Sequence, residues 1–226
     1  MTGAPIRFYG RRKGHALSAA QRRLVDELLP ELAVADDGEI DLGAMFPGAQ
    51  TIWLEIGFGK GEHLAWQAAR HPEIGFIGCE PYINGVAGLL AAIARNGLKN
   101  TRIFAEDARL LLPRLAPASI SCVFLLHPDP WHKWRHAKRR FVSPENLDQL
   151  ARIMTPGAEL RISTDDATYC RWTLLQMLAR KDFAWAAERA DDWRHPPEDW
   201  LETRYAAKAQ REGRSPVYLS FERVVL

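Results

Sequence analysis

Residues 51–61 read TIWLEIGFGKG, an apolar run followed by three glycines at alternate positions. The apolar run has the length and composition of a buried strand, and the glycines predict a tight turn into a helix that begins near Glu62. A strand, a glycine-rich turn and a helix form a nucleotide-binding corner, because the missing side chains let a ligand approach the backbone.

Six further segments have the pattern of strands, at residues 75–79, 101–105, 119–126, 158–163, 183–188 and 216–225. Segments with helical spacing lie between most of them, and Ser18 and Ser143 are candidate N-caps. This alternation predicts an α/β fold, a doubly wound, mostly parallel seven-stranded sheet. We expect a basic N-terminal arm and helix over residues 1–35, with residues 1–16 mobile, and a single α/β domain over residues 36–226.

Composition and charge narrow the class of protein. No apolar stretch is long enough for a membrane span. The first residues include Arg7, Arg11, Arg12 and Lys13 but no apolar signal core, so we expect no secretory peptide. Cys79, Cys122 and Cys170 lie within apolar patterns and are odd in number, which indicates a reduced, cytoplasmic protein. The net charge is only +2, yet residues 1–25 hold six Lys or Arg and no acid. This uneven distribution is typical of a surface that binds phosphate.

Acidic side chains surround the glycine turn and end the neighbouring strands. Glu80 ends the second strand, about 20 residues beyond the glycines, where an acid commonly binds ribose hydroxyls. Glu106 and Asp107 follow the third strand, where a carboxylate could accept a hydrogen bond from an adenine amino group. Glu55 and Glu62 flank the turn, which suits a cationic ligand better than a pyrophosphate. The acids therefore favour S-adenosylmethionine, a sulfonium, over a nicotinamide cofactor.

A proline-flanked carboxylate follows the fourth strand, in the sequence HPDPW of residues 127–131. Neither proline can extend a ladder or a helix, so we expect Asp129 on a stiff turn at the carboxyl end of the strand. We expect Trp131 and Trp134 to pack rather than to stack on a base. A basic run without an acid follows: Lys133, Arg135, Lys138, Arg139 and Arg140. A fixed carboxylate beside such a surface suits a catalytic corner that acts on a polyanion.

These motifs resemble those of the bacterial tRNA (guanine-N7-)-methyltransferases, a family of class I S-adenosylmethionine-dependent enzymes. The resemblance rests on residues 54–61, on the PDPWxKxxxxKRR run of residues 128–140 and on Ser163-Thr164-Asp165. It extends from Ile6 through nearly the whole chain. The glycine turn is shared by many methyltransferases, whereas the run after the fourth strand is far more particular to this family.

The resemblance implies methyl transfer from S-adenosylmethionine to N7 of a guanosine in tRNA, with Asp129 at the catalytic centre. Together with the glycine turn, it gives as cofactor contacts Glu55, Gly57, Gly59, Gly61, Glu80, Asp107 and Asp129. It implies that Lys133 and Asp165 contact the target nucleotide and that the RNA lies along Arg135, Lys138, Arg139 and Arg140. A C-terminal signature for the target guanosine stands as Thr203, Arg204 and Tyr205, followed by Ala206 where the family has glutamate. Because guanine N7 carries a free lone pair, we assign Asp129 to orientation and electrostatic stabilisation and not to proton removal.

Other interpretations stay open at this stage. The chain could methylate another RNA or a small substrate, or, given Ala206, be a catalytically weak RNA-binding relative. The acids around the glycine turn disfavour a nicotinamide dehydrogenase. His127, His132 and His136 lie among cations with no cysteine or acid at metal spacing, so we expect no metal. The sequence implies tRNA as partner and no membrane, and sets neither the oligomeric state nor the modified position.

Overall fold

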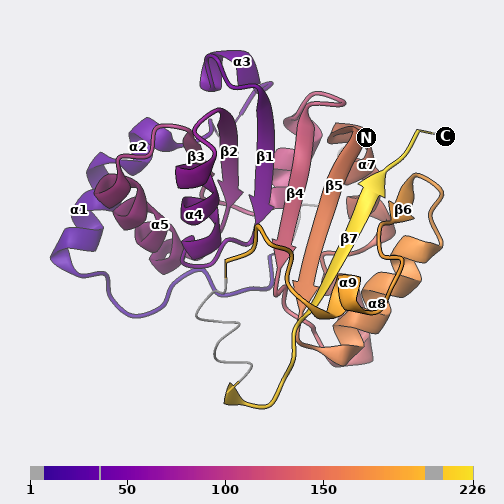
Figure 1. Cartoon of the computed structure of the whole chain (residues 1–226). Coiled ribbons are helices and arrows are strands. Elements are labelled where there is room, and N and C mark those ends of the chain that lie inside the picture. The colour runs from indigo at the N-terminus through magenta and orange to yellow at the C-terminus, as the bar shows by residue number, and fades with distance from the viewer. Residues whose placement is uncertain (1–7, 36, 202–210, 226) are drawn as a thin grey trace.

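The computed structural model describes residues 8–35, 37–201 and 211–225. Its centre is a seven-stranded sheet in the order β3-β2-β1-β4-β5-β7-β6 (Figure 1). Neighbouring strands pair in parallel except at β7, which runs antiparallel to both β5 and β6. The strands are β1 (Thr51–Ile56), β2 (Ile74–Cys79), β3 (Thr101–Phe104), β4 (Ile120–Leu126), β5 (Met154–Thr164), β6 (Phe183–Trp185) and β7 (Val217–Arg223). The predicted doubly wound, mostly parallel sheet is therefore confirmed.

Helices α1 and α7 begin at the caps that the sequence predicts. Ser18 and Gln21 form a complete capping box, and Ser143 caps a helix whose first residue is Pro144. The α-helices are α1 (Ala19–Glu27), α2 (Leu29–Leu32), α3 (Leu42–Met45), α4 (Glu62–Arg70), α5 (Ile83–Asn96), α6 (Ala108–Leu111), α7 (Pro144–Ile153), α8 (Ala167–Leu178) and α9 (Asp191–Arg194). Two 3₁₀-helices, η1 (Leu112–Arg114) and η2 (Trp134–Arg139), complete the described elements. No helix in these ranges is long and apolar enough to cross a membrane.

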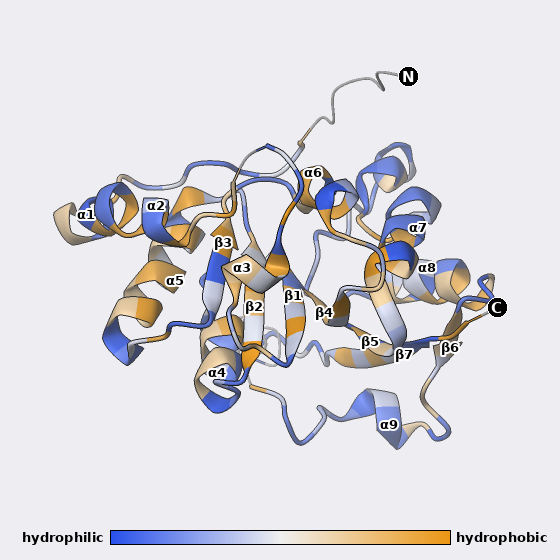
Figure 2. Ribbon diagram, turned by 90° about the horizontal axis from the view of Figure 1, so that it is seen from above, coloured by the Kyte–Doolittle hydropathy of each residue, from blue (hydrophilic) through white to orange (hydrophobic). Residues whose placement is uncertain are grey.

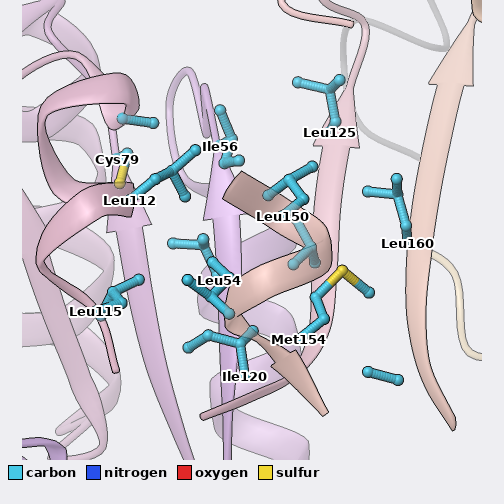
Figure 3. Close-up of a cluster of buried hydrophobic side chains, with 14 of the residues drawn as sticks. Leu54, Ile56, Cys79, Leu112, Leu115, Ile120, Leu125, Leu150, Met154 and Leu160 are labelled. Atoms are coloured by element: carbon cyan, nitrogen blue, oxygen red, sulfur yellow. The ribbon is translucent and has the colours of Figure 1, made fainter. Parts of the chain in front are cut away.

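Two hydrophobic cores cover the two faces of the sheet. One packs α6, α7 and α8 against β1, β4 and β5, where Leu150 of α7 lies over the strands with Leu54, Leu125 and Leu160 (Figure 3). The other packs α4 and α5 against β2, with Leu24 and other residues of α1 at its margin. Figure 2 shows α7 and α4 on opposite sides of the sheet. This two-sided burial explains why β1 and β4 are almost continuously apolar.

The structure differs from the expected element boundaries mainly around β5. This strand was expected at residues 158–163, but it begins at Met154, directly after α7. Pro156 and Gly157 lie within it, and the pairing with β4 shifts register between Ile120 and Cys122. Gly157 has φ 79°, and the two residues form an irregularity in the strand. β6 is shorter than expected and ends at Trp185.

Candidate active site

A cavity of about 790 Å³ opens at the carboxyl ends of β1, β2 and β4. Between β1 and β4 the strand order changes direction, which is where open α/β sheets bind ligands. Five of the predicted cofactor contacts line it: Gly57, Gly59, Glu80, Asp107 and Asp129. The volume lies within the range of small-molecule sites.

The three glycines of the turn serve two purposes. Gly57 and Gly59 have φ of 73° and 57°, and no atom lies within 4 Å of where a Cβ would stand. This open space lies on the cavity wall and lets a ligand approach the backbone. At Gly61 a Cβ would come within 2.6 Å of the Cβ of Leu89. Gly61 therefore allows α4 to pack against α5 and lies outside the cavity lining.

Two backbone amides fix Glu80, and one of them belongs to the glycine turn. Its Oε2 accepts a hydrogen bond from the Gly59 amide at 2.8 Å, and its Oε1 accepts one from the Tyr82 amide at 2.9 Å. Burial raises the pKa of Glu80; the two backbone hydrogen bonds oppose this, and the nearby charges of Asp129 and Glu55 add to it. The site is therefore rich in negative charge, which a cationic ligand would stabilise.

Asp129 stands on a strained turn at the end of β4. His127 and Trp131, on either side of the Pro-Asp-Pro sequence, have φ of 48° and 45°. Arg140 holds the turn from behind: its Nε donates to the Pro130 carbonyl at 2.9 Å and its Nη2 to the Trp131 carbonyl at 3.2 Å. Asp129 itself is exposed towards the cavity. The stiff, strand-end position expected for this carboxylate is what the structure has.

The other two predicted cofactor acids are already bound by neighbouring side chains. Glu55 is 4% exposed, and its Oε2 pairs with His63 Nδ1 at 2.8 Å. Asp107 accepts from the Arg109 amide at 3.0 Å, and Arg109 Nη2 donates to its Oδ2 at 2.6 Å. Asp107 stays on the cavity wall, whereas Glu55 does not line it. Neither Arg109 nor His63 was predicted as a partner, because such pairing depends on side-chain direction.

The basic run divides into exposed and buried cations. Lys133, Arg135 and Lys138 are exposed on or beside η2. Arg140 is only 4% exposed, with its guanidinium 4.8 Å from the ring centroid of Trp172. Two carbonyls and a tryptophan enclose it, and it supports the Asp129 turn. Its place along the RNA stays a prediction.

The two tryptophans of this region also differ. Trp131 is half-buried and lines the cavity, as packing predicts. Trp134 is 82% exposed, so the prediction that it packs is wrong. It lies at the first position of the 3₁₀-helix, between exposed Lys133 and Arg135. An exposed indole between two cations is available for stacking on a base.

Asp165 lies beside the turn that carries Asp129 and contacts the side chains of Arg214 and His127. It forms an ion pair with Arg214, and its Oδ1 lies 3.5 Å from His127 Nδ1. Burial and the charge of Arg214 lower the pKa of His127 to about 4. The adjacent Asp166 is an ordinary N-cap that accepts from the Tyr169 amide at 2.7 Å. Of the Asp165-Asp166 pair, only Asp165 is directed into this cluster.

Residues 8–11 of the N-terminal segment line the cavity. Tyr9 packs edge-on against Trp131, with ring centroids 6.4 Å apart. The Arg139 guanidinium lies 4.3 Å from the Tyr9 centroid and 4.9 Å from that of Trp131. Arg12 Nη1 bonds Glu106 Oε1 at 2.8 Å on the far side. From residue 8 onward the segment therefore contacts the rest of the domain. A mobile arm, as expected for residues 1–16, would lack such contacts.

The remaining predictions are placed as follows. Thr203, Arg204 and Tyr205, with Ala206, lie outside the described residues. Within the described ranges, no group of three or more His, Cys, Asp or Glu side chains is arranged to hold a metal ion. His132 Nδ1 instead lies 3.4 Å from Asp166 Oδ2, and the His136 ring packs against Trp131.

Solved structures share this architecture. The 16S rRNA methyltransferase KamB matches with a TM-score of 0.59 at 19% identity, over 84% of this chain and 96% of its own. The aminoglycoside resistance methyltransferase NpmB1 matches with a TM-score of 0.56 at 17% identity, over 81% and 92%. At these identities the likeness bears on the fold alone. The sheet order, the antiparallel β7 and the glycine turn together define the class I methyltransferase fold.

Sequence relatives give the finer assignment. The tRNA (guanine-N(7)-)-methyltransferases of Ruegeria pomeroyi and Roseobacter denitrificans are 52% and 51% identical over 96% of this chain and 94% and 95% of theirs. A family model described as "Putative methyltransferase" matches residues 49–219. The chain belongs to the tRNA (guanine-N(7)-)-methyltransferase family, as its motifs predicted.

Proposed function

We propose that this chain transfers a methyl group from S-adenosylmethionine to N7 of a guanosine in tRNA, forming 7-methylguanosine. One observation carries the proposal: Asp129 lines the same cavity as the glycine turn and Glu80, and the exposed basic helix η2 follows it within a few residues. Methyl donor and polyanionic substrate would therefore meet at this carboxylate. Because tRNA is the substrate, we place the reaction in the cytoplasm.

The residues around the cavity fit S-adenosylmethionine, which supplies a methyl group on a positively charged sulfur. Gly57 and Gly59 leave room for close backbone contact. Glu80 keeps lone pairs free after its two backbone hydrogen bonds, so it can accept from ribose hydroxyls. Asp107 lies on the cavity wall beside Arg109 and would accept a hydrogen bond from the adenine amino group. In this proposal Glu55 and Gly61 support the pocket from outside its lining.

Asp129 acts on the reaction by position and charge. Guanine N7 already presents a lone pair, so no base is required before it attacks the methyl group. As the bond forms, positive charge moves from sulfur to the purine ring, and a fixed carboxylate stabilises that charge. Arg140 keeps the carboxylate in place by binding the two carbonyls that follow it. Fixed geometry of this kind is a large part of catalysis when no proton moves.

The tRNA surface consists of Lys133, Arg135 and Lys138, with Arg139 at the edge of the cavity. Trp134 offers a platform for an unstacked base. Asp165 would bind the donor edge of the target guanine, in place of its contact with Arg214. Thr203, Arg204 and Tyr205 complete the proposed substrate site.

The test is to incubate the chain with an unmodified tRNA transcript and methyl-labelled S-adenosylmethionine, and to analyse the nucleosides by mass spectrometry. We expect labelled 7-methylguanosine as the product. A transcript made with 7-deazaguanosine has no N7 atom and should gain no label. Label in another nucleoside, or label that persists in the 7-deaza transcript, would contradict the proposal. Binding of tRNA without methylation would favour the RNA-binding alternative.

A further inference from the structure

A buried chain of hydrogen bonds runs from the tip of β1 to the segment that precedes residue 202. Glu55 Oε2 pairs with His63 Nδ1 at 2.8 Å, and His63 Nε2 pairs with Gln67 Nε2 at 3.3 Å. The same Gln67 nitrogen donates to the carbonyl of Asp199 at 3.0 Å. His63 is 2% exposed and Gln67 is fully buried. Both side chains come from α4, the helix that the glycine turn begins.

The donors and acceptors in this series of hydrogen bonds are compatible with one arrangement of the protons. The Gln67 amide nitrogen carries two hydrogens, which suffice for His63 Nε2 and the Asp199 carbonyl. Nε2 of His63 must then be an acceptor, so its proton lies on Nδ1 and is donated to the Glu55 carboxylate. The imidazole is neutral in this arrangement. Glu55, which would be costly to bury alone, has its partner there.

Further contacts hold the same segment from the other strands of the sheet. Arg161 of β5 donates through Nη1 to Asp199 Oδ2 at 2.6 Å. The Trp200 ring lies 5.4 Å from His63 and 5.1 Å from Tyr218 of β7. Asp199 and Trp200 are thus bound to α4, β5 and β7 at once. A segment held at several points loses its freedom to shift on the sheet.

The position of this segment matters for the reaction. From Leu201 the chain continues into residues 202–210, which include the proposed target-guanosine signature at 203–205. At its other end, the network starts at Glu55, two residues before Gly57 of the cofactor turn. One hydrogen-bond network therefore joins two parts of the molecule. At one end is β1, which leads into the cofactor turn, and at the other are the residues that directly precede the proposed target-guanosine signature.

We infer that His63 and Gln67 are positioning residues, which fix residues 199–201 to the cofactor-binding strand and helix and so set the approach of the target guanine to the methyl donor. The inference rests on the proposed function. It predicts that loss of the network impairs the methyl-transfer step and leaves the affinity for S-adenosylmethionine unchanged. A misplacement of about 1 Å can cost on the order of 100-fold in rate.

The experiment uses Gln67→Met, which keeps the volume but cannot donate, and Trp200→Ala with Trp200→Phe as its conservative partner. We expect kcat for tRNA methylation to fall roughly 10- to 100-fold in Gln67→Met and Trp200→Ala, and S-adenosylmethionine Kd to stay within about twofold. Trp200→Phe should recover most of kcat. Hydrogen exchange at residues 199–201 should accelerate in Gln67→Met.

Asn100→Ala provides the matched control. Its Nδ2 donates to the carbonyls of Ala68, His71 and Ile74 at the opposite end of α4, so the variant should lose stability but keep kcat. Unchanged kcat in Gln67→Met and Trp200→Ala, or an equal loss in Asn100→Ala, would overturn the inference. Unchanged exchange at 199–201 would overturn it even if the wild type proves unable to methylate tRNA, an outcome that by itself contradicts only the proposed function.

Discussion

The tip of β1 and β2 and the tip of β4 face the same cavity, but they hold their functional groups by different means. At β1 and β2 the backbone makes the site: glycines leave space, and the amides of Gly59 and Tyr82 fix Glu80. At β4 side chains make it: Arg140 binds the turn that carries Asp129. The first arrangement follows from residue type and spacing, whereas the second depends on which way each cation points.

The largest effect should come from the carboxylate at the β4 tip. Asp129→Asn keeps the size of the side chain and removes its charge. Loss of one fixed electrostatic group commonly lowers kcat about 100- to 1,000-fold, and we expect a loss in that range with tRNA affinity almost unchanged. Single-turnover methylation and tRNA binding on the same preparation measure both. A rate within about threefold of wild type would remove Asp129 from the mechanism.

The second-largest effect should come from Arg140, which supports the turn that carries Asp129. Arg140→Lys retains the charge but cannot bind two carbonyls as a fork, and Arg140→Met also loses the charge. We expect Arg140→Met to lower the free energy of unfolding by about 2–4 kcal/mol, because buried carbonyls lose their donor. kcat should fall in both variants. If tRNA affinity fell instead, with stability and kcat unchanged, Arg140 would be an RNA contact after all.

His127, in the same turn, gives a pH-dependent effect. Its pKa in the fold is about 4, below the ordinary 6.5, so the unfolded chain binds more protons between these values. Stability should therefore fall as pH decreases from 6.5 towards 4, by up to about 3 kcal/mol from this group. His127→Asn tolerates the positive φ and cannot titrate. Denaturant unfolding across this range should show a smaller loss in the variant; equal losses would contradict the assignment.

The smallest effect should come from the exposed cations. Arg135→Gln should weaken tRNA binding a few-fold and lower the salt dependence of log K by roughly 0.7–0.9 for one lost phosphate contact. Arg95→Gln, an exposed position at the end of α5, is the matched control and should change neither quantity. Equal slopes in both variants would mean that η2 does not face the RNA.

The sequence predicts those features of the fold that depend on residues near one another in the chain, such as strand ends and helix caps. Strand β1 was predicted to the residue because an apolar run ends at glycines, and the caps at Ser18 and Ser143 have the predicted bonds. The meeting of Glu80 and Asp129 in one cavity follows from parallel strands ending at the same edge.

The features that the sequence did not predict depend on tertiary contacts. Arg140 and Arg135 are alike in sequence, yet one is buried against carbonyls and Trp172 and the other is exposed. The partner of Glu55 is His63 on α4, a pairing set by how the helix packs on the strand. Likewise, the docked Tyr9 depends on a cation, Arg139, 130 residues away in the chain. No local sequence pattern shows which side chains are buried or which distant residues they contact.

The most direct test of the account is the pH dependence of S-adenosylmethionine affinity in wild type and Glu80→Gln, measured by calorimetric titration. Burial raises the pKa of Glu80 above its ordinary 4.5, and the donor should bind the ionised form, so binding should release a proton. We predict that wild-type Kd increases as pH falls through this raised pKa, and that Glu80→Gln binds more weakly with a flatter dependence. Wild-type affinity that is independent of pH, or an identical profile in Glu80→Gln, would contradict the claim that ionised strand-end carboxylates hold the methyl donor.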